Sequence, residues 1–143
     1  MNYRKLGKTD FEISEISLGT WQVGGKWGSS FDHKNAENII NCAIDNGVNF
    51  IDTADVYSDG LSEEAVGKAV RSRSGRIFVA TKCGRKIFPH SNAGYKTETL
   101  QKFVEDSKQS VGSSSEFGQP GRMMDDMIEH IAMKNPSLFT INI

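Results

Sequence analysis

The feature that most constrains the fold is a continuous apolar segment, residues 76–82, which ends in a cation at Lys82. A strand with one face in water alternates apolar and polar residues, and this segment does not alternate. Such a strand is expected to be buried on both faces, as in parallel sheets that are covered by helices. The segment therefore predicts a parallel α/β fold.

The rest of the chain up to about residue 110 predicts alternating strands and helices. A turn-rich stretch at residues 7–10 suggests a hairpin over residues 3–14, which leads into a half-buried strand over residues 13–18. Another short strand is expected at residues 48–51. Because strand and helix alternate three times, we expect parallel β/α units with right-handed crossovers that place the helices outside the sheet.

Three helices are predicted from apolar residues that recur on one face. The first is followed by Gly47, which suits a C-terminal cap. Ser62 is expected to cap the second helix, whose first turn holds Glu63 and Glu64. The third is expected over about residues 97–110. The inward-facing residues of the three helices are Ala36, Ile39, Ile40, Ala43 and Ile44; Leu61, Ala65, Val66, Ala69 and Val70; and Leu100, Phe103 and Val104.

Composition divides the chain into three parts. Residues 1–111 have the make-up of one compact domain, and residues 112–121 are rich in glycine and serine, as in a flexible linker. Residues 122–143 form a tail in which we expect a helix and, at its end, a possible strand. Our hypothesis is that this tail covers apolar surface of the domain and pairs with an edge of its sheet. A disordered tail is the alternative.

Composition also excludes several classes of function. With 24% charged residues and a net charge of −1, the chain shows no sign of nucleic-acid binding. It has no apolar segment near the ~20 residues that span a bilayer, and residues 1–5 lack the apolar core of a signal peptide. We therefore expect a cytoplasmic protein without a membrane partner. Cys42 and Cys83 lack the spacing of metal ligands and are expected to be reduced and buried, so no metal site is predicted.

Candidate functional residues stand at the ends of the expected strands, where the loops of a parallel α/β fold converge. These residues are Gly19, Thr20 and Trp21; Asp52, with Tyr57 a few residues on; and Lys82. A carboxylate, a phenol and an ammonium group from adjacent strands could meet within hydrogen-bonding distance. The ammonium would favour the ionised phenol, and the carboxylate would hold the ammonium charged and oriented. If water is excluded, such a trio suits a tyrosine that acts as a general acid.

The same residues also fit a simpler interpretation. Asp52 could cap a turn or helix, Tyr57 could be a half-buried loop aromatic, and Lys82 could be a solvated residue at a strand end. Spacing alone leaves both interpretations open. The glycine-rich residues 23–28 lack the spacing of a phosphate-binding loop and are interpreted as a flexible connection.

Four segments resemble successive motifs of the aldo/keto reductase family, in the same order and at similar separations. They are residues 3–7 (YRKLG), 18–21 (LGTW), 49–57 (NFIDTADVY) and 80–82 (ATK). The resemblance runs from residue 1 to about residue 107 and implies an eight-stranded α/β barrel. Because a complete barrel usually needs about 250 residues, we expect an incomplete (β/α)8 TIM-type barrel, with an N-terminal hairpin, three parallel β/α units and an appended helix.

The resemblance implies an NADPH-dependent oxidoreductase that reduces a small aldehyde or ketone to an alcohol, with the hydride chemistry carried by the cofactor. Tyr57 matches the general acid of the family, and Lys82 and Asp52 match the partners that activate it. The loop Gly19-Thr20-Trp21 matches the segment that lines the nicotinamide pocket, and Asp52 is also expected to lie beside the cofactor.

The chain departs from the family pattern after about residue 107. The expected fourth strand, which would end in a histidine that orients the substrate carbonyl, does not follow, and His33, His90 and His130 do not match that role. With few strands the site would be open to water, so we expect little or no activity from the chain alone. The open sheet edges of such a fragment also favour self-association.

Three functions therefore stay open. The first is carbonyl reduction, either by this chain alone or through an association that completes a barrel. The second is a non-catalytic folding, assembly or interaction module. The third is a cofactor-binding relic without turnover.

Overall fold

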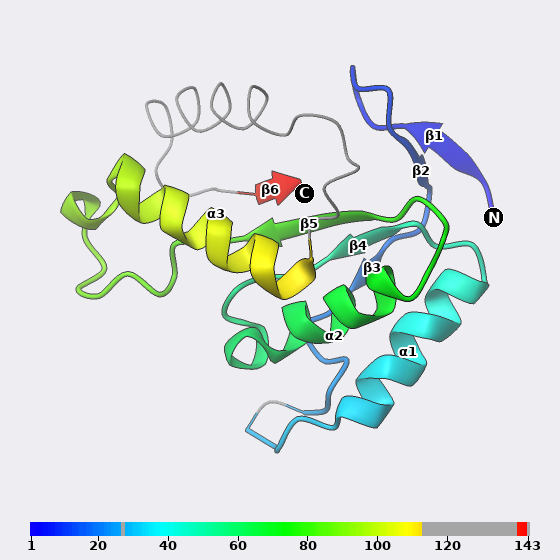
Figure 1. The fold of residues 1–143 in the computed structure, drawn as a ribbon, viewed down its shortest axis with the longest axis horizontal. Coiled ribbons are helices and arrows are strands. Elements are labelled where there is room, and N and C mark those ends of the chain that lie inside the picture. The colour runs from blue at the N-terminus through cyan, green and yellow to red at the C-terminus, as the bar shows by residue number, and fades with distance from the viewer. Residues whose placement is uncertain (27, 113–139, 143) are drawn as a thin grey trace.

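The computed structural model describes residues 1–26, 28–112 and 140–142. The predicted helix of the tail and residues 113–121 of the predicted linker lie outside these residues, so the three-part division of the chain stays a prediction. Within the described part, three parallel strands alternate with three helices, and the predicted α/β class is confirmed (Figure 1).

The strands form two sheets. A hairpin pairs β1 (Tyr3–Lys5) with β2 (Glu12–Ser14). The main sheet has the order β3-β4-β5-β6, in which the first three strands are parallel and β6 is antiparallel to β5. These strands are β3 (Leu18–Gly19), β4 (Phe50–Asp52), β5 (Phe78–Lys82) and β6 (Thr140–Asn142). The hairpin and the parallel pairing agree with the predictions.

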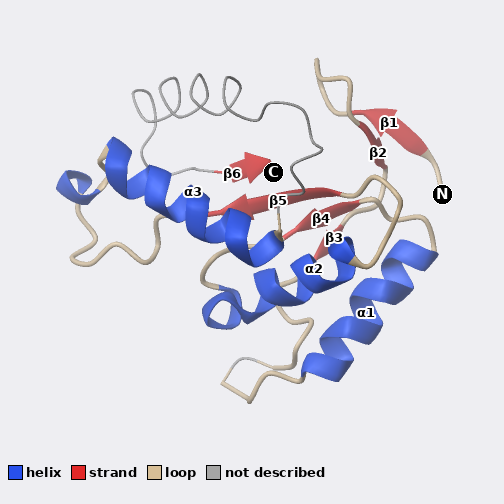
Figure 2. Cartoon of the chain, viewed as in Figure 1, coloured by secondary structure: helices blue, strands red, loops and turns tan. Residues whose placement is uncertain are grey.

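Three helices pack beside this sheet, with α2 between the other two (Figure 2). They are α1 (His33–Asp45), α2 (Leu61–Arg71) and α3 (Thr97–Val111), and two short 3-10 turns, η1 (Tyr57–Gly60) and η2 (Asn92–Gly94), lie in the loops. The core is apolar and draws on both layers, which explains why β4 and β5 begin with apolar residues and carry polar ones only toward their ends. Its buried members are Ile40, Ile51, Val66, Ala69, Ile77, Val79 and Val111.

The strand predicted over residues 13–18 is wrong in its extent, because the chain bends between β2 and β3. The Ser14 hydroxyl donates a hydrogen bond to the Ile16 carbonyl at 2.7 Å, which turns the backbone away from an extended course. Ser14 and Asn49 also exchange two hydrogen bonds, of 2.6 and 3.1 Å. The hairpin is thereby fixed to the entry of β4.

The predicted role of Ser62 as a helix cap is also wrong. Gly60 takes the N-cap position of α2, with φ of 93°, a conformation that glycine adopts without strain. Ser62 lies in the first turn, fully buried, and its hydroxyl donates a hydrogen bond to the Thr20 carbonyl at 3.2 Å. Ser62 therefore connects α2 to the end of β3.

The contact between α2 and α3 is close because Gly67 has no side chain. A Cβ atom at Gly67 would lie 2.2 Å from the Ser110 carbonyl oxygen and 2.6 Å from that of Val111. The Arg71 guanidinium also donates to both carbonyls, at 3.4 and 3.3 Å, and so satisfies acceptors at the end of α3. These contacts fix α3 against α2.

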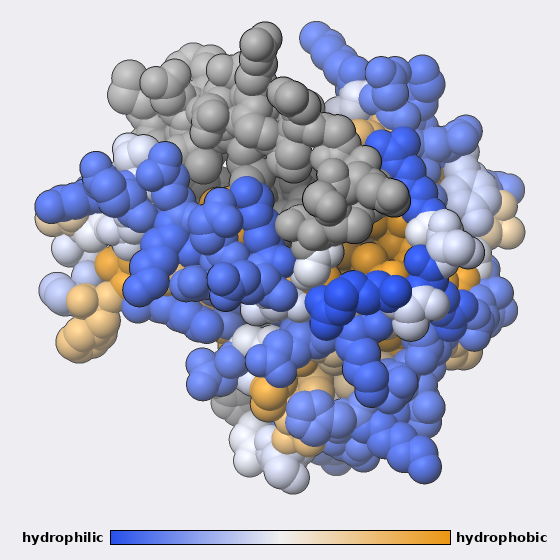
Figure 3. Space-filling model, in the orientation of Figure 1, coloured by the Kyte–Doolittle hydropathy of each residue, from blue (hydrophilic) through white to orange (hydrophobic). Residues whose placement is uncertain are grey.

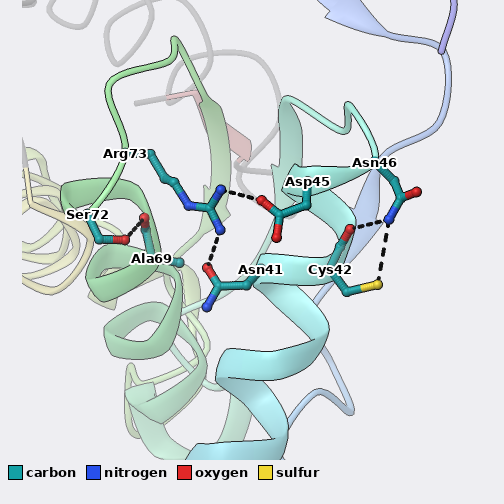
Figure 4. A network of polar contacts seen from close by, with 7 residues as sticks. All are labelled: Asn41, Cys42, Asp45, Asn46, Ala69, Ser72 and Arg73. Atoms are coloured by element: carbon teal, nitrogen blue, oxygen red, sulfur yellow. Dashed lines mark hydrogen bonds and ion pairs between the residues drawn. The ribbon is translucent and has the colours of Figure 1, made fainter.

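A polar network joins α1 to the segment after α2 (Figure 4). The Arg73 guanidinium donates to the Asp45 carboxylate and, at 3.0 Å, to the Asn41 side-chain oxygen. The hydrogen bond from Arg73 lowers the pKa of Asp45 below its ordinary value. Cys42, on the same helix, is exposed, so the prediction of a buried thiol was wrong there; the apolar pattern does not distinguish a cysteine at the margin of the buried face.

The surface in Figure 3 is mostly hydrophilic, and hydrophobic residues gather only in small areas of the face shown. None of the helices in the described part of the chain has the length and apolar character of a membrane-spanning segment.

Candidate active site

The ends of β3, β4 and β5 lie side by side and bring the predicted residues together. Gly19 is in register with Asp52, and Asp52 is in register with Ala80. The backbone N–H of Thr53 donates to the Ala80 carbonyl at 2.8 Å, and that of Asp55 donates to the Lys82 carbonyl at 3.0 Å. The segment after β4 therefore continues along β5 as far as Lys82.

The Lys82 ammonium group lies at the centre of the cluster. It donates to the Asp52 carboxylate, to the Thr53 carbonyl at 2.9 Å and to the Tyr57 hydroxyl at 3.4 Å. A lysine ammonium has three donors, so each one has an acceptor here. The three contacts fix the direction of the ammonium and place its charge beside the phenol.

Tyr57 is held by its backbone and by its ring. Its backbone N–H donates to the Ala54 carbonyl at 3.1 Å, and its ring meets the Trp21 ring edge to face, with centroids 4.9 Å apart. Ser58 and Asp59, which follow it, both have positive φ, a conformation that costs about 1 kcal/mol or more per non-glycine residue. The tight turn lets the chain leave the strand end and enter α2 directly.

The cluster is partly open to solvent. The side chains of Asp52 and Lys82 are each 36% exposed, and Trp21 is 45% exposed. At this exposure, water screens the attraction between charges, which is well below its value in a dry interior.

The three residues after β3 have different environments. Gly19 is exposed, and a Cβ atom there would meet nothing within 4 Å, so the strand end has open space beside it. Thr20 is fully buried, and its hydroxyl has no hydrogen-bond partner among the described residues. The Trp21 ring contacts the Tyr57 ring. The structure thus brings Trp21 to the site and keeps the Thr20 side chain inside.

Two carboxyl groups near the site are buried, and the sequence pattern predicted no role for either. Glu63 accepts a hydrogen bond of 2.5 Å from the buried Thr81 hydroxyl. Asp55 is 5% exposed, and neither of its carboxylate oxygens has a partner of normal hydrogen-bond geometry in the described part of the chain, although the amides of Gly84 and Val56 are near. Burial raises the pKa of Asp55 to about 6; Lys86 opposes the rise and Glu63 adds to it.

Cys83 follows Lys82 and is partly buried beside these acids. Burial, together with the charges of Asp55 and Glu63, raises the pKa of the Cys83 thiol to about 12. The group is therefore a neutral thiol near neutral pH and a poor nucleophile. The described residues include no group of three or more His, Cys, Asp or Glu side chains placed to hold a metal ion.

A pocket of about 370 Å³ adjoins the cluster and is lined by Trp21, Val56, Arg85 and His90. Trp21 contacts the Tyr57 ring and Val56 precedes Tyr57 in the chain, so the pocket and the cluster share the Trp21 wall, although Tyr57 itself does not line the pocket. The segment from Cys83 to Tyr95 was predicted only as a loop. The signal available was its charge, because residues 83–96 contain Arg85, Lys86 and Lys96 but no acidic residue.

Comparisons with known proteins agree with this arrangement. The model of the aldo/keto reductase family matches residues 15–115. The chain is 36% identical over 108 residues to aldo-keto reductase YhdN of Bacillus subtilis, covering 71% of this chain and 33% of that protein. This chain therefore spans about a third of the length of that curated relative.

Solved structures give the same result. The holo form of aldo-keto reductase AKR11C1 from Bacillus halodurans matches with a TM-score of 0.66 and 30% identity, over 79% of this chain and 37% of that one. An aldo/keto reductase from Klebsiella pneumoniae, in complex with NADP and acetate, matches with a TM-score of 0.56 and 25% identity, over 71% of this chain and 32% of that one. The predicted fold, part of a TIM-type barrel, is confirmed.

Proposed function

Because the chain belongs to the aldo/keto reductase family, we propose that it provides the acid–base half of an NADPH-dependent site that reduces aldehydes or ketones to alcohols. The observation that supports this most directly is the contact of the Lys82 ammonium with both the Asp52 carboxylate and the Tyr57 hydroxyl.

In the proposed reaction Tyr57 is the general acid. Its hydroxyl gives a proton to the carbonyl oxygen of the substrate as that oxygen gains negative charge. The phenolate that remains lies 3.4 Å from the Lys82 ammonium, which stabilises it. That attraction is worth about 1 kcal/mol in water and about 4 kcal/mol at the effective dielectric of a protein surface, for charges about 4 Å apart. The contact with the Asp52 carboxylate orients the ammonium.

The residues at the strand ends fit the cofactor that the family implies. Gly19 leaves open space beside β3, and the exposed ring of Trp21 offers a flat apolar surface next to Tyr57. We propose that Gly19, the Thr20 backbone, Trp21 and Asp52 hold the nicotinamide end. NADPH, when bound, supplies the hydride that reduces the carbonyl carbon. Water must be excluded for Lys82 to act at full strength, so we expect slow turnover by this chain alone.

The test measures NADPH oxidation in the presence of aldehydes, monitored as the loss of NADPH absorbance. We expect the chain to turn over slowly. Tyr57→Phe is expected to lower that turnover at least about 100-fold, since the general acid is removed. Tyr3→Phe is the matched control, because Tyr3 lies in β1 of the hairpin, where its hydroxyl donates to the Gly47 carbonyl after α1. Turnover that survives Tyr57→Phe would contradict the assignment of Tyr57.

A non-catalytic module remains the second candidate, because Asp52 and Lys82 are each 36% exposed and therefore screened by water. An absence of both turnover and NADPH binding, measured by calorimetry, would support this second function and overturn the first.

A further inference from the structure

We propose that the pocket beside Tyr57 selects carbonyl compounds that carry a carboxylate at the end remote from the carbonyl. This inference rests on the proposed function, since it assigns the class of substrate reduced at the same site. It is carried by the composition of the pocket and of the loop that borders it.

The pocket has an apolar side and a basic side. Trp21 and Val56 supply the apolar side, while Arg85 and His90 supply the basic side. Its volume, about 370 Å³, falls at the low end of the range of small-molecule sites, which is roughly 300–1,000 Å³. A small molecule with an apolar body and one anionic end fits this division.

Within the described residues, the loop beside the pocket contributes an unpaired cation at Arg85, whereas the charge of Lys86 acts on the Asp55 carboxyl. Arg85 makes no ion pair with any residue that the structure describes, and residues 83–96 contain no acid that could neutralise it. Of the acids of the site, Asp52 pairs with Lys82, and Asp55 is buried, with Lys86 as the cation that acts on it. An anion entering the pocket therefore meets a positive potential.

The arrangement also orients the ligand. A guanidinium binds a carboxylate through two parallel hydrogen bonds, which fix direction as well as position. The His90 ring nitrogens lie 3.3–3.4 Å from the Tyr95 hydroxyl, and this contact helps to fix the ring at the pocket wall. Trp21 connects the two ends of the site, because it lines the pocket and contacts Tyr57. A carboxylate held at Arg85 would leave the other end of the ligand at the Trp21 side of the pocket, the side that adjoins Tyr57.

The test compares 4-carboxybenzaldehyde with 4-methylbenzaldehyde, which differ in charge and little in size. We expect the ratio of their kcat/KM values to favour the charged aldehyde in the wild-type chain. Arg85→Gln is expected to lower this ratio roughly tenfold, the usual size of a charge-assisted contact near a surface. Added salt is expected to lower the wild-type ratio as well.

Arg4→Gln is the matched control, because it removes the same charge from the hairpin, where Arg4 pairs with Glu15 in solvent. It is expected to leave the ratio unchanged. A ratio unaffected by Arg85→Gln would overturn the inference. So would an equal fall in kcat/KM for both aldehydes together with an increase in the KM for NADPH, because Arg85 would then serve the phosphates of the cofactor.

If neither aldehyde is turned over, the proposed function fails and the inference is judged by binding alone. In an NMR titration of the full chain, benzoate is expected to shift the indole N–H signal of Trp21, and Arg85→Gln is expected to weaken that binding several-fold. Benzyl alcohol serves as the uncharged probe. Equal effects of benzoate and benzyl alcohol in both chains would overturn the inference independently of catalysis.

Discussion

Asp55 has an environment unlike that of the acids around it. Its backbone N–H donates to the Lys82 carbonyl at 3.0 Å, which connects the segment before Tyr57 to the end of β5. Its carboxyl group is buried and accepts no hydrogen bond of normal geometry from the described residues. A charge in that position is costly, because burial removes water and the nearby amides of Gly84 and Val56 replace it only in part.

The first prediction concerns Asp55→Asn. Because the folded chain raises the pKa of Asp55 from 3.8 to about 6, the folded state binds the proton more tightly than the unfolded state does. The stability from this group is therefore fully present below pH ~4 and is lost as pH rises through about 6. The asparagine variant is not subject to this loss. Its free energy of unfolding, relative to the wild type, is expected to rise by about 2 kcal/mol between about pH 4 and pH 8.

Denaturant unfolding at both pH values measures this difference. Asp59→Asn is the control, because Asp59 is exposed and asparagine tolerates its positive φ. Its stability relative to the wild type is expected to be the same at both pH values. An equally flat result for Asp55→Asn would show that the Asp55 carboxyl is solvated.

At this scale the sequence predicted which residues meet, but not which residues are buried. Asp52, Tyr57 and Lys82 could be found because each follows a recognisable strand or motif. Asp55 stands in the same motif, and nothing in the pattern distinguishes its buried carboxyl from the half-exposed one of Asp52. Burial of a loop side chain depends on tertiary packing, here against the segment around Gly84 and Lys86.

Among the elements, the α2–α3 contact gives the second prediction. Gly→Ala within a helix ordinarily stabilises it by up to about 1 kcal/mol. At Gly67 the new Cβ atom would lie 2.2 Å from the Ser110 carbonyl oxygen, so the helices must separate. We expect Gly67→Ala to lower the free energy of unfolding by about 1–3 kcal/mol, the usual cost of overpacking, in thermal or denaturant unfolding.

Gly75→Ala provides the control for this prediction. Gly75 lies after α2, has no positive φ, and a Cβ atom there would meet nothing within 4 Å. Its replacement is expected to be neutral or to stabilise the chain by up to about 1 kcal/mol, because the unfolded chain loses freedom. If Gly67→Ala stabilised the chain equally, the close contact between the helices would be contradicted.

The sequence predicted the helices better than it predicted their ends and contacts. The apolar repeat placed α1 and α3 within a few residues, because a helix must bury one face wherever it packs. The start of α2 was misplaced, because a serine before an apolar run fits both a cap and a buried first turn. The need for a glycine at position 67 depends on a second helix, which a local pattern does not show.

At the scale of the whole molecule, the edges of the main sheet decide how the chain associates. β3 pairs with β4 within the described residues, and β5 pairs with both β4 and β6. The pairing with β6 agrees with the hypothesis that the end of the chain pairs with a sheet edge. In the register of β5 and β6, Lys82 stands opposite Thr140, so β6 runs along β5 as far as the strand end that carries the proposed site.

The third prediction is that removal of residues 140–143 makes the chain self-associate. Deletion of β6 leaves the N–H and C=O groups along one side of β5 without partners. Exposed groups of this kind pair with the edge of another chain. We expect sedimentation velocity to show oligomers that increase with concentration, and thermal unfolding to begin at a lower temperature than in the full chain.

The control for this deletion is a chain that lacks Ile143 alone, because β6 (Thr140–Asn142) is then kept whole. Its sedimentation is expected to match that of the full chain. If both shortened chains sediment alike and unfold alike, β6 does not protect the edge of β5. The deletion of residues 140–143 could also raise turnover. That result would indicate that another chain pairs with the β5 edge, in place of β6, when the chains assemble. The functional prediction of an association that completes the barrel would then be supported together with the structural one.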